Sequence, residues 1–118
     1  MEMKVTRLYT GSDGESHFED MTVPLKDQEG YFEWSEPIKA TGIIFAELYN
    51  DELLDWHNAP RRQFIITLEG EVEIGIGDGT KRIFRAGDVI LAEDTTGRGH
   101  SRRRGKNQHH KVIIVTLD

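Results

Sequence analysis

The sequence predicts an all-β protein, a double-stranded β-helix or jelly-roll barrel with little or no helix. Short stretches rich in β-branched and aromatic residues recur along the chain, and turns containing Gly, Asp and Thr separate them. No window of about 11 residues or more shows sustained helical periodicity. The pattern indicates roughly eight or nine strands, a number that favours a sandwich or a barrel.

Length and composition indicate one globular domain. The 118 residues suffice for a single core, and 36% hydrophobic with 31% charged residues is typical of a soluble protein. No apolar run approaches the roughly 18 residues of a membrane span, and no signal peptide is visible. The chain has no cysteine, which excludes disulfides, thiolate metal ligands and cysteine nucleophiles. We therefore expect a cytoplasmic location and no membrane partner.

Charge is unevenly distributed. Residues 1–55 carry 13 acidic and 4 basic groups, and residues 56–118 carry 8 and 11, which together give the net charge of −6. This acidity argues against a nucleic-acid partner, because such proteins present a basic domain or stripe. The exception is a local basic cluster, which is either a solvated loop or an anion or nucleic-acid contact. The cluster comprises Arg98, Arg102, Arg103, Arg104 and Lys106.

The first 49 residues predict three strands and a loop. The strands are Met3–Tyr9, Ser16–Leu25 and Thr41–Tyr49. The turn at residues 10–14 separates the first two, and Pro24 limits the second because it cannot donate to a sheet. Residues 26–40 are expected to form a loop whose aromatic side chains cover one end of the core. Those aromatic residues are Tyr31, Phe32 and Trp34.

The stretch Asp55–Gly70, DWHNAPRRQFIITLEG, predicts the entrance strand of the barrel and ends in a tight Glu-Gly turn. Asp78-Gly79 then predicts a hairpin between residues 71–77 and 80–85, because this pair suits positive φ angles. Gly87 predicts a further turn. The remaining elements are a strand at Val89–Glu93, a loop at residues 94–99 and a buried strand at Lys111–Leu117.

Two segments of the chain resemble the two motifs of the cupin family. The family's first motif is Gly-x5-His-x-His-x3–4-Glu-x6-Gly, and its second is Gly-x5-Pro-x-Gly-x2-His-x3-Asn. His57 takes the first histidine position of motif one, Ala59 stands where the second would be, and Gln63 stands in place of the glutamate. The gap from Gln63 to Gly70 is that of the family.

The second motif departs further from the family pattern. It begins at Gly87, but Glu93 replaces the proline and His100 comes two residues late. The resemblance covers residues 41–117. It implies one cupin-like domain over residues 1–118, with residues 1–40 as N-terminal strands and an aromatic loop, and residues 41–117 as the barrel core that carries both motifs.

The resemblance implies a divalent metal held by His57, Gln63 and His100. Zinc, iron, nickel or manganese would suit imidazole ligands, although an amide oxygen is a poorer ligand than a carboxylate and Ala59 supplies none. No organic cofactor is expected. Each group also has a structural alternative: His57 as a rim residue, Gln63 as a partner of buried backbone groups, and His100 as a surface imidazole.

Side-chain alternation predicts the rest of the site. If Gln63 points inward, Arg61, Ile65 and Thr67 share its face and line a substrate pocket with Trp56. Arg61 would orient an anion. Glu93 would act as a general base or form a salt bridge with Arg61. His109 and His110 alternate, so at most one of them faces inward.

Two functions are compatible with these residues. One is a metal-dependent enzyme acting on a small anionic or sugar-like substrate in the barrel mouth. The other is a non-catalytic module that binds a small molecule without metal. Fold alone cannot choose the reaction. The resemblance also implies a homodimer in which residues 3–25 add to a neighbour's sheet.

Overall fold

The computed structural model describes residues 2–48, 54–104 and 109–118, and this part of the chain is all-β with no helix, as predicted. The described residues accordingly offer no long apolar helix that could cross a membrane. The strands are β1 (Glu2–Thr10), β2 (Ser16–Pro24), β3 (Lys26–Gln28), β4 (Phe32–Trp34), β5 (Gly42–Leu48), β6 (Leu54–His57), β7 (Gln63–Glu69), β8 (Glu71–Gly75), β9 (Lys81–Arg85), β10 (Val89–Glu93), β11 (His100–Arg104) and β12 (His110–Thr116).

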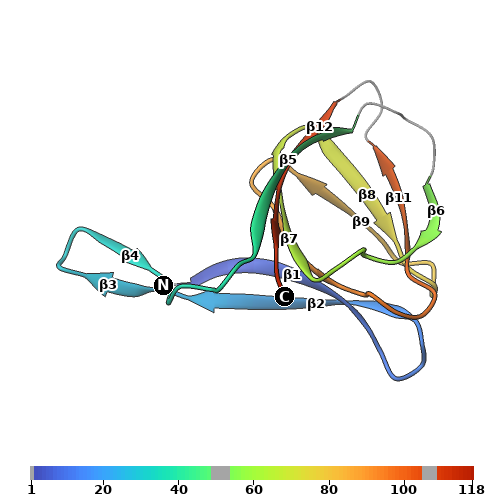
Figure 1. The fold of residues 1–118 in the computed structure, drawn as a ribbon, viewed down its shortest axis with the longest axis horizontal. Coiled ribbons are helices and arrows are strands. Elements are labelled where there is room, and N and C mark those ends of the chain that lie inside the picture. The colour runs from blue at the N-terminus through green and yellow to red at the C-terminus, as the bar shows by residue number, and fades with distance from the viewer. Residues whose placement is uncertain (1, 49–53, 105–108) are drawn as a thin grey trace.

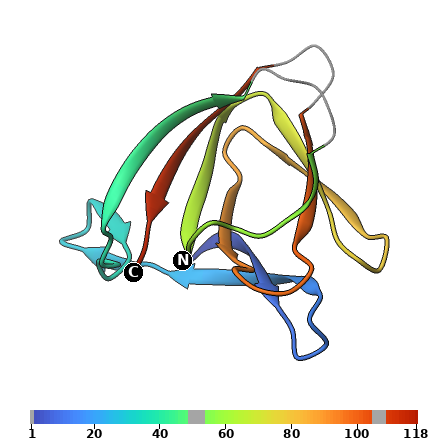
Figure 2. The same cartoon turned by 45° about the vertical axis from the view of Figure 1, so that its right-hand side comes forward.

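Strands β5 to β12 form a jelly roll of two facing sheets (Figures 1 and 2). One sheet has the order β5-β12-β7-β10 and the other β6-β11-β8-β9. The chain crosses from one sheet to the other at every connection except the β8–β9 hairpin. This connectivity is that of a jelly roll, which closes most of its strand edges by wrapping two sheets around one core. Strands β1 and β2 extend the first sheet, with β1 parallel to β10.

The core lies between the two sheets because side chains alternate along each strand. Leu8, Val72, Ile74, Phe84 and Ile90 are buried there in one cluster. A second cluster packs on the other face of the six-stranded sheet. It consists of Val5, Leu91 and Leu117, with Met21, Val23, Phe64 and Val89 against it.

The predicted turns are present, and each depends on glycine. Gly70, between β7 and β8, has φ 79°, and a Cβ there would overlap the carbonyl oxygen of His109. Gly79 closes the β8–β9 hairpin with φ 92°, while Asp78 Oδ1 accepts a hydrogen bond from the amide of Thr80 at 2.8 Å. Gly87, with φ 94°, turns the chain between β9 and β10. Such φ angles strain any residue with a Cβ.

The prediction for residues 26–40 was wrong. The segment contains β3 and β4, which pair as an arm that projects away from the barrel (Figure 1). Its aromatic side chains cover no core: Tyr31 is 85% exposed, and Phe32 and Trp34 contact each other edge to face at 4.6 Å. The reason is the length of β1 and β2. Their register pairs Glu2 with Pro24, and this carries the chain past the end of the barrel.

Two further predictions needed correction. The stretch Asp55–Gly70 is not one strand, because β6 and β7 belong to opposite sheets. The basic segment after His100 is not a loop, because residues 100–104 form β11 between β6 and β8. The sequence analysis did not recognise this strand because its residues are mostly charged. Its alternation places His100 and Arg102 on the same side, toward the barrel interior.

Candidate functional site

A cavity of about 110 Å3 lies between the two sheets of the barrel. Aliphatic side chains from β1, β5, β7, β8, β10 and β12 form most of its wall, and few polar groups reach it. A mostly apolar cavity with a small number of convergent polar groups is typical of a small-molecule site. The polar lining residues are His57, Asn58, Gln63, His100, Arg102 and His110.

A buried carboxylate orients His100. Asp94, which directly follows β10, is 0% exposed, and its Oδ2 accepts a hydrogen bond from Ser16 Oγ at 2.7 Å. The same oxygen lies 2.6 Å from Nδ1 of His100. We assign the ring proton to Nδ1, because the partner is a carboxylate oxygen. The lone pair on Nε2, at the opposite side of the ring, is then available to the cavity that His100 lines.

His57 faces His100 across neighbouring strands. The two residues are opposite each other in the β6–β11 register, and their ring centroids are 4.4 Å apart. Nδ1 of His57 lies 2.9 Å from the carbonyl oxygen of Asp55, so Nδ1 carries the proton and Nε2 is an acceptor. Burial lowers the pKa of His57 below its ordinary value. The charge of Arg102 acts in the same direction, whereas the bond to the Asp55 carbonyl and the charge of Asp94 act against it.

Gln63 lines the cavity, and Arg61 is bonded to it. Gln63 is only 5% exposed, and its Oε1 accepts a hydrogen bond from Arg61 Nη1 at 2.9 Å. The Arg61 side chain itself is exposed and is absent from the cavity wall. The predicted anion-orienting guanidinium therefore reaches the site only through the Gln63 amide.

Glu93 and Trp56 lie outside the cavity. Ala92 faces inward, so the next residue of β10 faces outward, where Glu93 accepts hydrogen bonds from Arg7 Nε at 2.6 Å and Arg62 Nε at 2.7 Å. Burial raises the pKa of Glu93, but these two arginines outweigh it and the net shift is downward. The structure thus pairs Glu93 with Arg7 and Arg62 rather than with Arg61. Trp56 is 41% exposed, with the Arg98 guanidinium 4.2 Å from its ring centre.

His110, the first residue of β12, also lines the cavity. Ile65 lines the wall. Thr67, predicted to line the pocket as well, is buried but is not part of the wall, and its Oγ1 lies 3.0 Å from Nε2 of His110. Burial, reinforced by the charge of Arg102, lowers the pKa of His110 to about 4. Nδ1 of His110 is buried without a hydrogen-bond partner among the described residues. His109 is exposed and bonds Glu47, so one of the two neighbouring histidines faces inward, as predicted.

Sequence reasoning missed Ser16 and Asp94, and it named Arg102 only as one member of the basic cluster, with an anion contact as an open alternative. Asp94 stands in a Gly- and Thr-rich loop that carries no marker of burial, and Ser16 meets it only because β1 and β2 flank β10. The sequence does contain a signal for the orientation of Arg102. Residues His100 to Arg104 contain neither glycine nor proline, and a strand there would place Arg102 on the His100 face.

The donor set does not fit the metal that the resemblance implies. His57 and His100 offer two ring nitrogens, while the Gln63 oxygen already accepts a bond from Arg61. Within residues 2–48, 54–104 and 109–118, no three His, Cys, Asp or Glu side chains come together as metal ligands. Ala59, where the family has another histidine, is buried with only a methyl side chain. Protein metal sites of this kind need at least three good donors. We therefore assign no chemistry to a metal, which stays a prediction.

The two motif segments meet at this cavity. His57 and His100 come from the adjacent strands β6 and β11, and Gln63 begins β7 on the facing sheet. They meet inside a jelly roll, which is the placement that the sequence motifs predict. The chain folds as a jelly roll, the fold that the resemblance implies. Within this barrel, the residues brought together are His57, Gln63 and His100, joined by Asp94, Arg102 and His110.

Comparisons with known proteins give low similarity. No protein family model matches the chain. Over 64 residues it is 31% identical to oryzines biosynthesis cluster protein J of Aspergillus oryzae, covering 53% of this chain and 34% of that protein, so the chain spans about a third of the relative's length. Protein NMB1881 of Neisseria meningitidis is 18% identical with a TM-score of 0.47, over 80% of this chain and 81% of that one. The cupin domain of Schizosaccharomyces pombe Cnp3 is 14% identical with a TM-score of 0.39, over 99% and 84%.

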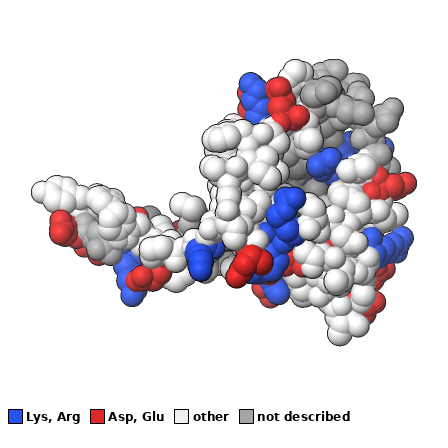
Figure 3. Space-filling view, in the orientation of Figure 1, with Lys and Arg blue, Asp and Glu red and all other residues white. Residues whose placement is uncertain are grey.

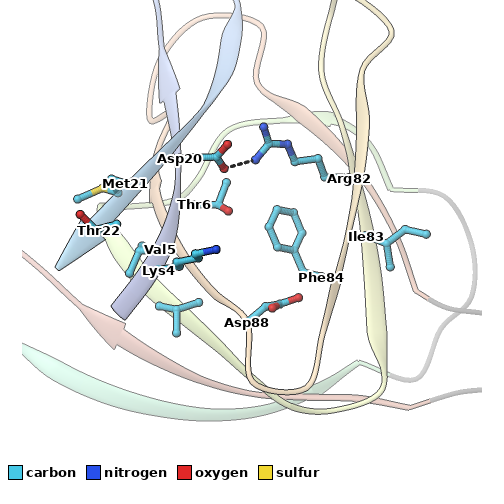
Figure 4. Close-up of a pocket in the computed structure, with 11 residues that line it drawn as sticks. Lys4, Val5, Thr6, Asp20, Met21, Thr22, Arg82, Ile83, Phe84 and Asp88 are labelled. Atoms are coloured by element: carbon cyan, nitrogen blue, oxygen red, sulfur yellow. Dashed lines mark hydrogen bonds and ion pairs between the residues drawn. The ribbon is translucent and has the colours of Figure 1, made fainter. Parts of the chain in front are cut away.

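A second hollow lies between the β1–β2 pair and β9, where β2 and β9 are edge strands of the two sheets (Figure 4). This groove is larger, about 560 Å3, and Val5, Met21 and Phe84 contribute its apolar part. Its arginine is already paired, since Arg82 Nη1 donates to Asp20 Oδ1 at 2.7 Å. On the face of the molecule shown in Figure 3, basic side chains likewise lie near acidic ones.

Proposed function

We propose that the protein binds a small organic molecule inside the cupin barrel and transfers a proton at Nε2 of His100. The observation that supports this most directly is the buried pair of Asp94 and His100. A carboxylate that fixes the tautomer and orientation of an imidazole makes the other ring nitrogen a general base. The apolar wall excludes water from the reacting atoms, which strengthens each electrostatic contact.

The proposed step needs only groups of this chain. Nε2 of His100 takes a proton from the bound molecule, and the negative charge of Asp94 stabilises the imidazolium that forms. The proton then returns to the same molecule, either at its original atom or at a neighbouring one. His57, held neutral by burial, accepts a hydrogen bond from the ligand at its own Nε2.

Deuterium incorporation tests this step and does not require the substrate to be identified first. The protein is incubated in D2O with a panel of small ketones and carboxylic acids, and exchange of C–H for C–D is followed by NMR. We expect catalysed exchange in at least one compound, lost by about 100-fold or more in His100→Gln. His109→Gln, which changes an exposed histidine, serves as the control. Exchange that persists in His100→Gln would refute the assignment.

A non-catalytic binding module is the second candidate. It is favoured by the polar lining of the cavity, in which the described residues include no carboxylic acid as a second proton donor. In this case molecules of the panel bind in the cavity, as shown by chemical-shift changes of residues that line it, but no deuterium is incorporated. Binding and exchange are measured on the same samples, so the two candidates are separated directly.

A homodimer remains part of the proposal. Residues 3–25 pair first with the chain's own sheet, because β1 lies between β10 and β2. Strand β2 is then the outer edge of the six-stranded sheet, and an open edge can pair with a second copy. Sedimentation of the full chain at micromolar concentration tests this: a dimer is expected, and a monomer would contradict it.

A further inference from the structure

We propose that Arg102 anchors the carboxylate group of a small aliphatic acid in the barrel cavity. This inference deepens the proposed function and rests on it, because it names the class of molecule that occupies the same cavity. Arg102 takes the anion-binding role that side-chain alternation in the sequence predicts for Arg61.

The position of Arg102 follows from strand alternation. Arg102 and His100 are two residues apart on β11, and both line the cavity. Arg103, between Arg102 and the end of the strand, is exposed and does not line it. An acid bound to Arg102 therefore lies on the same face of β11 as the imidazole that Asp94 orients.

The charge of Arg102 has no counterpart in the described part of the chain. Arg7, Arg82 and Arg98 each contact a carboxylate, with N–O distances between 2.6 and 3.4 Å. Arg102 is partly buried, yet no described carboxylate or other acceptor bonds to it. Burial lowers the pKa of Arg102 from its ordinary value. An unpaired charge removed from water is unfavourable, so the site favours a ligand that supplies the missing anion.

A second polar group has no partner at the same place. Nδ1 of His110 is buried without a hydrogen bond among the described residues, and His110 lines the cavity. Arg102 and His110 line the same cavity of about 110 Å3, from β11 and β12. A carboxylate has two oxygens and accepts several hydrogen bonds. One such group could therefore engage the guanidinium and the His110 ring together.

The cavity also limits the rest of the ligand. Its volume of about 110 Å3 suits a molecule of few non-hydrogen atoms, and its wall is mainly aliphatic, from residues such as Ile65, Ile74 and Ile90. A short hydrocarbon body satisfies this wall, whereas a sugar or a nucleotide would bring polar groups without partners. The occupant is therefore a short aliphatic carboxylate.

Binding of propionate and of its neutral isostere propionamide tests the inference on the full chain, by NMR titration. We expect propionate to bind at least about tenfold more tightly than propionamide, since bonds to charged groups exceed neutral ones. Arg102→Gln should remove this preference. Arg103→Gln is the matched control, because it deletes the neighbouring charge on the outer face of the same strand, and it should bind like the original protein.

The outcomes separate this inference from the proposed function. If propionamide binds as well as propionate, or if Arg102→Gln keeps the preference, the cavity is a ligand site but the carboxylate anchor is wrong. If neither compound shifts any cavity resonance, the carboxylate anchor is wrong, whereas the proposed function fails only if no compound of the exchange panel binds or exchanges.

The urea concentration at which the protein unfolds is an independent measurement. A ligand anchor and a structural role for Arg102 predict opposite changes in it. We expect Arg102→Gln to unfold at an equal or higher urea concentration than the original protein, because it relieves an unpaired, partly buried charge. A clearly lower midpoint would show that Arg102 supports the fold and would overturn its assignment as a ligand anchor.

Discussion

The barrel cavity and the outer groove use similar residue types in different ways. The cavity is the smaller hollow, about 110 Å3 against about 560 Å3. It lies inside the barrel, whereas the groove lies at the edges of the two sheets, between the β1–β2 pair and β9 (Figure 4). In the groove, Arg82 and Asp20 pair with each other, and the Asp20 side chain is 80% exposed. Asp94, which does not line the cavity but bonds His100 in its wall, is fully buried. Arg102, which lines the cavity, has no paired carboxylate in the described residues.

This difference shows that burial, rather than volume, marks the candidate site. Exposed ion pairs gain little because water competes with them. A buried carboxylate must be hydrogen-bonded, and in this barrel its partners are Ser16 and the imidazole of His100. The His100 imidazole is therefore held in one geometry, which a binding or catalytic site requires.

The largest difference in unfolding free energy between the two regions should appear when the carboxylate of each is removed. Asp94→Ala leaves the Ser16 hydroxyl and the His100 Nδ1–H without their shared acceptor, and we expect it to lower the free energy of unfolding by about 3–5 kcal/mol. Asp20→Ala should lower it by less than about 1 kcal/mol. Urea titrations of both variants measure the two losses. Equal losses would contradict the prediction that the buried carboxylate stabilises the fold more than the exposed one.

The pH dependence of stability should come largely from the cavity. The pKa of His110 falls from 6.5 to about 4 on folding, so the unfolded chain takes up its proton first as the pH falls. The stabilisation is complete above pH 6.5 and is lost between pH 6.5 and about 4. At 1.36 kcal/mol per pKa unit, the loss is about 3 kcal/mol.

Urea unfolding at pH 7.5, 5.5 and 4.5 measures this loss. His110→Gln is the reference, because it retains a polar side chain at this position but cannot titrate in this range. The difference between the two proteins should shrink as the pH falls. A difference that stays constant would show that His110 is not held neutral.

The metal that the resemblance implies can be tested by restoring the missing donors. Ala59→His combined with Gln63→Glu should bind close to one equivalent of zinc, whereas the original protein should hold well below one. The larger side chain in a packed position should also destabilise the fold by about 1–3 kcal/mol. Elemental analysis of untagged protein decides: one equivalent in the original protein, lost in His57→Ala, would contradict the metal-free proposal.

The smallest effect should come from the groove. Lys4→Ala removes an exposed cation that lines only the groove, so we expect a change in unfolding free energy within about 0.5 kcal/mol and unchanged propionate binding. The same titrations measure both quantities. A substantial loss of propionate affinity would place the anion site in the groove instead.

Local sequence determined much of the fold. Gly70, Gly79 and Gly87 indicated the turns, where the structure has positive φ angles, and the apolar runs of β7 and β12 indicated strands. The pairing of motif segments also predicted that His57, Gln63 and His100 would share one cavity. These features depend on residues close together in the chain, so a single sequence displays them.

Tertiary structure alone decided the rest, because it depends on register and burial between distant residues. Ser16 reaches Asp94 across 78 positions only because β1 and β2 join the sheet beside β10. The length of that same pair carries residues 26–34 away from the core that they were expected to cover. Arg102 has the same side chain as Arg103, yet one strand position turns it from solvent to the cavity. The sequence supplied the charge, and the pairing of β11 between β6 and β8 placed it inside.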